Sequence, residues 1–280
     1  MERLLIVDGS NLLFQMFFGM PARIVNEQGK AIQGTLGFVG ALLKILRMTQ
    51  ATHVLVVFDG EHENPRSALD ENYKANRVDY SALPEEDSPF SQLEDIYAAL
   101  RYLSVCFLET EQCEADDLIA GYAYALGEEI EVVISSFDSD FFQLIGRRVS
   151  VLRYRGDKSV WCGEDYLAQR FGITSEQYAD FKSLTGDPAD NIRGAEKIGP
   201  KTAAALLREF GSLDQILARS GEIAKPSVRD SVQRNALRLQ NNYRMIKLGP
   251  REELPIPLSQ LHYEDRGLTT TQVLRDIGLK

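Results

Sequence analysis

Seven carboxylates stand where predicted β-strands end. Asp8 directly follows the apolar run 4–7, and Asp59 directly follows 54–58. The C-terminal ends of parallel strands meet at one edge of a sheet, so we expect these acids to converge. The remaining five open the helix after the third strand or follow the fourth strand: Glu114, Asp116, Asp117, Asp138 and Asp140.

Acidic residues are also common at helix N-termini and in loops, where they cap free amides. Taken alone, each of these motifs fits that interpretation. Together, seven neighbouring carboxylates would repel one another strongly unless cations were present. The pattern therefore predicts a metal site.

Oxygen ligands without histidine or cysteine favour Mg²⁺ over zinc, and Mn²⁺ can take its place. Such a large set of acids indicates two ions, which can stabilise the attacking and the leaving oxygen of a phosphoryl displacement. We expect phosphodiester hydrolysis, with Asp116 and Asp138 needed for catalysis. His53, His62 and His262 are the only histidines, and no Ser-His-Asp arrangement competes.

Asp187 and Asp190 lie three residues apart, a spacing that places both on one side of a helical turn. They could extend the metal site. The alternative is an Asp-Pro turn with a capping aspartate, which is the preferred interpretation of the segment taken alone.

The segment 197–202 predicts a phosphate-binding helix start. Gly199 allows a close backbone approach, and Pro200 suits the first helical position. We expect the amides of Lys201 and Thr202 to face outward and bind phosphate, with Lys197 and Arg208 adding positive charge. An ordinary capped helix start is the alternative.

The elements that must position these residues follow a β-α-β pattern. Strands are predicted at 4–7, 54–58, 105–108 and 131–134, with a further candidate at 150–153, and helices at 36–46 and 115–126. This favours an α/β fold with a mostly parallel central sheet and flanking helices in residues 1–165. Trp161 and Tyr166 are expected in the core.

Two segments depart from this pattern. Residues 61–90 contain three prolines and many charges, so we expect a mobile surface excursion. From 166 to 280 helical signals dominate, including 201–210 before Gly211, which predicts a helical subdomain.

The composition is compatible with a nucleic-acid partner despite a net charge of −10. The nine acids assigned above carry −9 of it and leave about −1 for the rest of the surface. With no long apolar run and no signal peptide, we expect a cytoplasmic protein without membrane association. The three cysteines lack metal-site spacing and are expected to be reduced and structural.

These motifs, in this order, resemble the bacterial and phage 5′ nucleases, the flap endonuclease relatives. The resemblance runs from Asp8 to about Leu213 and rests on Asp8-Gly9, Phe58-Asp59, Glu114-Ala-Asp-Asp117, Asp138-Ser-Asp140, Gly186-Asp-Pro-Ala-Asp-Asn191 and Ile198-Gly-Pro-Lys-Thr202. It implies a PIN-like fold and a monomeric, nucleoid-associated enzyme of replication or repair. Its substrates would be 5′ flaps, nicks, 5′ ends and branched duplex DNA.

The resemblance also implies residue roles. All nine acids, Asp187 and Asp190 included, would bind the two metal ions. Residues 61–90 would form an arch around a 5′ single strand, in which Lys74 and Arg77 steer the scissile phosphate and Arg66 and Tyr73 contact DNA. Residues 180–215 would form a helix-three-turn-helix that binds the duplex through Lys197, Gly199, Lys201 and Thr202, with a site for K⁺.

Some positions depart from the family pattern, and the departures bear on rate and substrate preference more than on activity. They spare every expected metal ligand but remove phosphate-handling groups: Gln15, Ser67, Asp70, Ser139 and Arg193. Two alternative functions stay open. One is a DNA-junction-binding protein with weak or lost nuclease activity. The other is a PIN-like ribonuclease, which would have no need of the segment 197–202.

Overall fold

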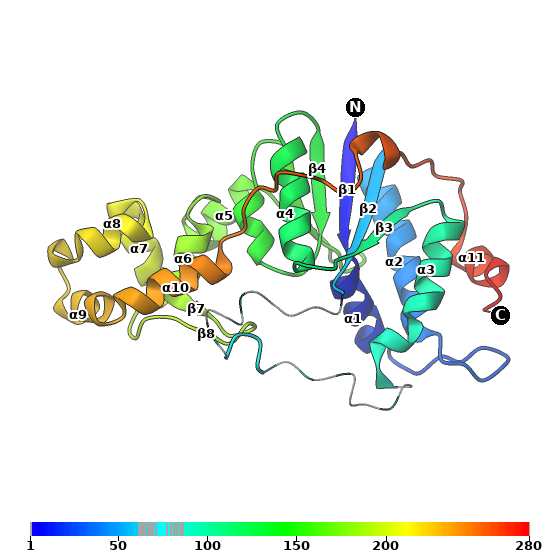
Figure 1. Cartoon of the computed structure of the whole chain (residues 1–280), viewed down its shortest axis with the longest axis horizontal. Coiled ribbons are helices and arrows are strands. Elements are labelled where there is room, and N and C mark those ends of the chain that lie inside the picture. The colour runs from blue at the N-terminus through cyan, green and yellow to red at the C-terminus, as the bar shows by residue number, and fades with distance from the viewer. Residues whose placement is uncertain are drawn as a thin grey trace.

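A six-stranded sheet forms the centre of the computed structural model, which describes residues 2–60, 66, 70, 72–76, 78, 80, 84 and 87–279. The strand order is β3-β2-β1-β4-β5-β6, with only β6 antiparallel to its neighbour. Figure 1 labels β1 to β4 of this sheet. The strands are β1 (Arg3–Asp8), β2 (His53–Phe58), β3 (Cys106–Glu109), β4 (Glu131–Ser135), β5 (Val149–Arg153) and β6 (Val160–Cys162). The predicted α/β fold with a mostly parallel sheet is confirmed.

The expectation that Trp161 lies in the core is wrong. Its side chain is 46% exposed, because it lies on β6, the short edge strand that the sequence did not predict. Tyr166 is half-buried and packs edge-on against Phe142, with ring centroids 5.6 Å apart.

Helices cover both faces of the sheet, and successive strand residues face opposite layers. Leu5 and Val7 of β1 pack into the cluster with α1, α2, α3 and α11, whereas Leu4 and Ile6 pack into the cluster with α4. These helices are α1 (Gly9–Gly19), α2 (Gln33–Thr49), α3 (Leu93–Tyr102), α4 (Ala115–Leu126) and α11 (Thr270–Asp276). The helices expected at 36–46 and 115–126 are thus present in α2 and α4.

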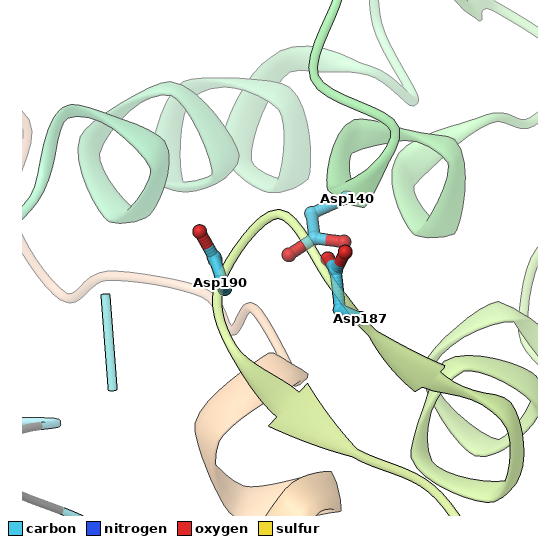
Figure 2. A group of neighbouring side chains, drawn as sticks. All are labelled: Asp140, Asp187 and Asp190. Carbon is cyan, nitrogen blue, oxygen red and sulfur yellow. The ribbon is translucent and has the colours of Figure 1, made fainter. Parts of the chain in front are cut away.

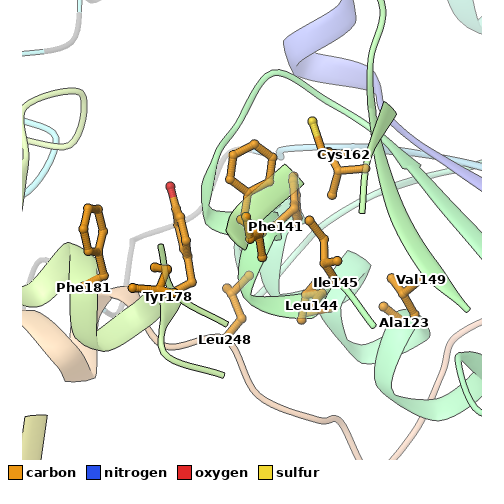
Figure 3. Packing of buried hydrophobic residues seen from close by; sticks show 14 of the residues in the cluster. Ala123, Phe141, Leu144, Ile145, Val149, Cys162, Tyr178, Phe181 and Leu248 are labelled. Atoms are coloured by element: carbon orange, nitrogen blue, oxygen red, sulfur yellow. The ribbon is translucent and has the colours of Figure 1, made fainter. Parts of the chain in front are cut away.

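The α4-side core continues into the helices beyond the sheet. Phe141 and Leu144, in the 3₁₀ helix η5 (Asp140–Leu144), share one buried cluster with Tyr178 and Phe181 of α6 (Figure 3). This packing fixes the segment that carries Asp140 against the segment that leads to Asp187. The two acidic segments therefore have a defined relative position.

The remaining elements are mostly short helices. They are α5 (Glu164–Phe171), α6 (Tyr178–Thr185), β7 (Gly186–Asp187), β8 (Ile192–Arg193), α7 (Pro200–Phe210), α8 (Leu213–Ala218), α9 (Pro226–Arg234), α10 (Ala236–Ile246), and the 3₁₀ helices η4 (Pro89–Gln92), η6 (Ser220–Glu222) and η7 (Leu258–Gln260). After α10 the chain returns to the sheet, where His262 forms a bridge with His53 and α11 packs on α2.

The cysteine thiols and the helix lengths bear on two further expectations, reduced cysteines and no membrane association. Cys106, Cys113 and Cys162 are all free thiols, as predicted, and Cys162 is buried. Over the described ranges, no helix combines the length and apolar character needed to cross a membrane.

Candidate metal centre

The ends of β1 and β2 carry the first two acids of the site. The parallel register pairs Asp8 with Val57, so Asp8 and Asp59 emerge at the same edge of the sheet. Asp8 caps α1 by accepting a hydrogen bond from the Asn11 amide at 2.9 Å. Asp59 Oδ1 accepts from the Ala115 amide at 2.8 Å and so ties the end of β2 to the start of α4.

Ser136 connects Asp8 to the acids that follow β4. Its hydroxyl donates to Asp8 Oδ2 at 2.8 Å and accepts from the Asp138 amide at 2.9 Å. Asp138 Oδ1 in turn accepts from the Asp140 amide at 2.8 Å. Local hydrogen bonds thus hold Asp8, Asp138 and Asp140 in one arrangement.

A second group of acids combines Asp140 with the turn between β7 and β8. Asp140, Asp187 and Asp190 are buried, and each offers a carboxylate oxygen within 4.8 Å of the others (Figure 2). Asp187 Oδ1 also accepts from the Ala189 amide at 3.1 Å. Asp187 thus stabilises the Asp-Pro turn, as the alternative interpretation expected, and this turn joins two short strands and is not helical. The carboxylates of Asp187 and Asp190 also lie near that of Asp140, and their role as metal ligands stays a prediction.

Burial and mutual repulsion change how these acids ionise. Burial, with the charges of neighbouring carboxylates added, raises the pKa of Asp8 and of Asp140 to about 7. The same causes raise the pKa of Asp116 well above its usual value, and burial raises that of Asp138. The carboxylates that raise the pKa of Asp116 are those of Asp138, Asp8 and Asp59, so these four acids form one interacting group, and the charge of Lys74 opposes the rise.

Lys182 is a buried member of the acidic cluster that the sequence analysis missed. It is 8% exposed, forms an ion pair with Asp187, and places Nζ 3.3 Å from Asp140 Oδ1. Burial lowers its pKa, but the Asp140 and Asp187 carboxylates outweigh burial and raise the pKa overall. The available signal was a lysine between Phe181 and Ser183 in a helix that is otherwise mostly apolar, with Asp180 as its other charged residue.

Glu114 and Asp117 pair with residues from the predicted arch. Arg66 and Lys74 both form ion pairs with Glu114, and Arg66 Nη2 lies 2.6 Å from Asp117 Oδ1. The Tyr73 hydroxyl is 3.3 Å from Glu114 and 3.4 Å from Asp190. Arg66, Tyr73 and Lys74 thus reach the acidic site, whereas Arg77 lies outside the described residues.

The donor set fits divalent cations. Every expected ligand is a carboxylate, and hard cations such as Mg²⁺ and Mn²⁺ prefer oxygen. The buried Oδ1 of Asp140 accepts no hydrogen bond from any described group, and its ion pair with Lys182 at 3.3 Å is the contact that a metal ion would have to replace. Acids with pKa values near 7 would bind protons in competition with a metal at neutral pH.

The segment 197–202, which leads into α7 and is called the hairpin from here on, differs from expectation in one detail. Lys197, Gly199 and Lys201 are exposed, and a methyl group added to Gly199 would meet open space. The Thr202 amide does not face outward, because it donates to Gly199 O at 3.0 Å. That part of the expectation is wrong, since the first turn of α7 is closed by an i to i−3 bond.

Two departures from the family pattern have defined contacts. Gln15 Nε2 donates to Tyr154 O at 2.8 Å, and so it braces α1 against the segment after β5. The Ser139 hydroxyl lies 3.2 Å from Lys182 Nζ and shares this ammonium group with Asp140.

Comparison with known proteins identifies two regions of the chain. Residues 3–172 match the family described as 5′-3′ exonuclease, N-terminal resolvase-like domain, and residues 173–267 match 5′-3′ exonuclease, C-terminal SAM fold. The chain is 35% identical over 265 residues to DNA polymerase I of Rhizobium leguminosarum, covering 92% of this chain and 25% of that protein. For the thermostable DNA polymerase I of Thermus thermophilus the identity is 34%, with 94% and 31% covered.

Solved structures share the fold. The T5 5′-exonuclease with bound zinc ions superposes with a TM-score of 0.73 at 24% identity, covering 88% of this chain and 89% of that one. The catalytic core of Rad2 in complex with DNA substrate gives a TM-score of 0.61 at 14% identity, covering 99% and 91%. Because these two adjacent family matches together span residues 3–267, the chain belongs to the 5′-3′ exonuclease family.

Proposed function

We propose that the chain is a structure-selective 5′ nuclease that hydrolyses DNA phosphodiesters with two divalent ions, Mg²⁺ with Mn²⁺ as a substitute. One observation carries the proposal: buried carboxylates from separate strand ends and from the β7–β8 turn lie together in a chain of the 5′-3′ exonuclease family. Its substrates would be 5′ flaps, nicks and 5′ ends of branched DNA.

The comparisons support this proposal without extending it to a polymerase. The chain spans about a quarter to a third of the length of the two DNA polymerase I relatives. The relative from phage T5 binds divalent metal ions, and one of its structures is a complex with DNA and metal ions. We propose a role in replication or repair, as a cytoplasmic monomer with the domain division at about residue 165.

The acids would hold the ions in two neighbouring groups. The first contains Asp8, Asp59, Asp116 and Asp138, and the second Asp140, Asp187 and Asp190, with Glu114 and Asp117 completing the set beside the arch residues. When bound, the ions would neutralise charge on the scissile phosphate and lower the pKa of an attacking water. Lys182 would have to give up at least one carboxylate to make room for them.

The remaining residues would bind and orient the DNA. Lys74 and Arg77 would steer the scissile phosphate, and Arg66 and Tyr73 would position the single strand. Lys197, Gly199, Lys201 and the hydroxyl of Thr202, whose amide is already used, would bind the duplex backbone without reading its bases, with K⁺ held at the same hairpin. The Lys201 amide has no acceptor among the described residues, which leaves it available to a phosphate.

The test uses three labelled substrates, a 5′ flap, a nicked duplex and a single-stranded RNA, each with Mg²⁺, Mn²⁺ or EDTA. We expect cleavage of the flap and the nicked duplex with either metal and none in EDTA. Binding of flap DNA without cleavage under any metal condition would favour the junction-binding alternative. Preferential cleavage of the RNA would favour the ribonuclease.

A further inference from the structure

A row of polar side chains on α9 and α10 holds the segment that joins the β7–β8 turn to the hairpin before α7. This row, the α9–α10 stripe, crosses the one-residue break between the two helices, and all of its members contact residues 193–196. Three members are buried, with Ser231 0%, Asn235 6% and Asn242 3% exposed. Its members are Ser231, Asn235, Arg238 and Asn242.

Asn242 ties the segment after the β7–β8 turn to α6. Its side-chain amide donates to Arg193 O at 2.9 Å and to Ser183 O at 3.0 Å. Arg193 ends β8, three residues after Asp190, and Ser183 follows Lys182 in α6. The two hydrogens of one amide thus fix the elements that carry these two site residues against each other.

The other members hold Glu196, three residues before Gly199. The Ser231 hydroxyl donates to Glu196 O at 2.5 Å, and Asn235 Nδ2 donates to Glu196 Oε2 at 2.7 Å. Arg238 Nη1 lies 3.5 Å from Glu196 Oε1 and from Gly194 O. One stripe therefore contacts both ends of the short connection between the acids and the hairpin.

The opposite side of this connection has no spare room. A Cβ on Gly186 would lie 2.4 Å from Gly194 N, and one on Gly194 would lie 2.3 Å from Thr185 C. Backbone therefore meets backbone on that side. The segment therefore cannot move closer to α6, where the Ala195 amide also donates to Leu184 O at 3.0 Å, and the hydrogen bonds of the stripe hold it to α9 and α10.

We propose that Asn242 and Asn235 are positioning residues that set the separation between the β7–β8 turn and the hairpin before α7, and so select which phosphodiester is cut. The inference rests on the proposed nuclease function. If the hairpin holds the duplex backbone while the acids hold the ions, a change in their separation presents a different phosphate to the acids. A misplacement of about 1 Å can cost about a hundredfold in rate.

The experiment compares Asn242→Ala with Asn241→Ala on a 5′-flap substrate of defined junction. Asn241 is half-buried, and no hydrogen bond of its side chain is found within the described part of the chain, so it is a matched control. Three quantities are measured: duplex affinity in EDTA, the single-turnover rate with Mg²⁺ at saturating enzyme, and product lengths at nucleotide resolution.

For Asn242→Ala we expect affinity within about twofold of wild type, a rate lowered about tenfold or more per folded molecule, and products spread to the adjacent phosphodiesters. Asn241→Ala should match wild type in all three. Loss of affinity with unchanged product lengths would overturn the proposal, and so would a normal rate per folded molecule with normal products.

Glu196→Ala provides a second test in case the buried variant Asn242→Ala fails to fold. The Glu196 side chain is 60% exposed, so its removal should leave the fold intact while taking away the acceptor of Asn235. We expect a smaller change in the same direction, and unchanged products would count against Asn235. If the wild type itself cuts no DNA, the proposed function fails, whereas wild-type cleavage with unaltered variants defeats only this inference.

Discussion

Lys182 Nζ lies 3.3 Å from Asp140 Oδ1 inside the group of acids that would hold a metal ion. The ammonium group therefore supplies the positive charge that these buried carboxylates need when no metal is bound. Breaking such a buried pair leaves charges uncompensated, which is costly.

Replacing this lysine should make the protein depend on metal for stability. We expect Lys182→Met to lower the melting temperature of the metal-free protein by roughly 5–10 °C. Saturating Mg²⁺ or Mn²⁺ should raise the melting temperature of Lys182→Met by more than it raises that of wild type, because an ion replaces the missing charge. Thermal unfolding with EDTA or metal measures this, with exposed Lys225→Met as control. Equal metal-induced shifts in both proteins would refute the idea.

Removing one ligand charge should separate cleavage from binding. In Asp138→Asn the amide oxygen can still accept the Asp140 amide hydrogen bond, so the local fold should survive. We expect this variant and Asp116→Asn to lose roughly a hundredfold or more in single-turnover rate, while metal-free DNA binding is kept or tightened. The control is Asp157→Asn on an exposed turn. A wild-type rate in either variant would remove that residue from the ligand set.

The parts of the site that follow regular strands could be predicted, and the parts that depend on tertiary packing could not. Asp8 and Asp59 were placed correctly because parallel strands put their ends at one edge. Lys182 was missed because only the packing of α6 against η5 turns its side chain toward Asp140. Trp161 was misplaced because apolar composition does not distinguish an exposed edge strand from a buried one.

A carboxyl group outside the metal site should make stability depend on pH. Asp180 is 7% exposed, and burial raises its pKa from 3.8 to about 6. The folded state therefore holds this proton more tightly than the unfolded chain does. The resulting stabilisation is complete below about pH 4 and is lost as pH rises to about 6 and beyond.

Asp180→Asn should lack this dependence. Its free energy of unfolding relative to wild type should rise by on the order of 2 kcal/mol between pH 4 and pH 7.5, because asparagine never ionises. Denaturant unfolding at a series of pH values, with exposed Asp165→Asn as control, measures the difference. A difference that stays constant with pH would show that Asp180 does not titrate in this range.

Lys201 tests whether the hairpin holds DNA or only starts a helix. Gly199 is the N-cap of α7, and no side-chain hydrogen bond caps this helix, so Lys201 has no capping role to lose. An acid in the first turn is favourable for the helix dipole. Lys201→Glu should therefore keep or slightly raise the melting temperature.

If Lys201 binds a backbone phosphate, the same variant should bind duplex DNA more weakly whatever the sequence. The slope of log affinity against log salt should fall by about 1, since one phosphate contact is lost. A salt titration of wild type, Lys201→Glu and Lys158→Glu, an equal charge change on the exposed β5–β6 turn, separates a local contact from a general change in net charge. Equal losses of duplex affinity in both variants would mean that Lys201 acts only through the net charge of the protein. An unchanged slope in Lys201→Glu would exclude Lys201 as a phosphate contact. A lysine that neutralises a phosphate releases a counterion from the DNA on binding, and reversing its charge removes that release.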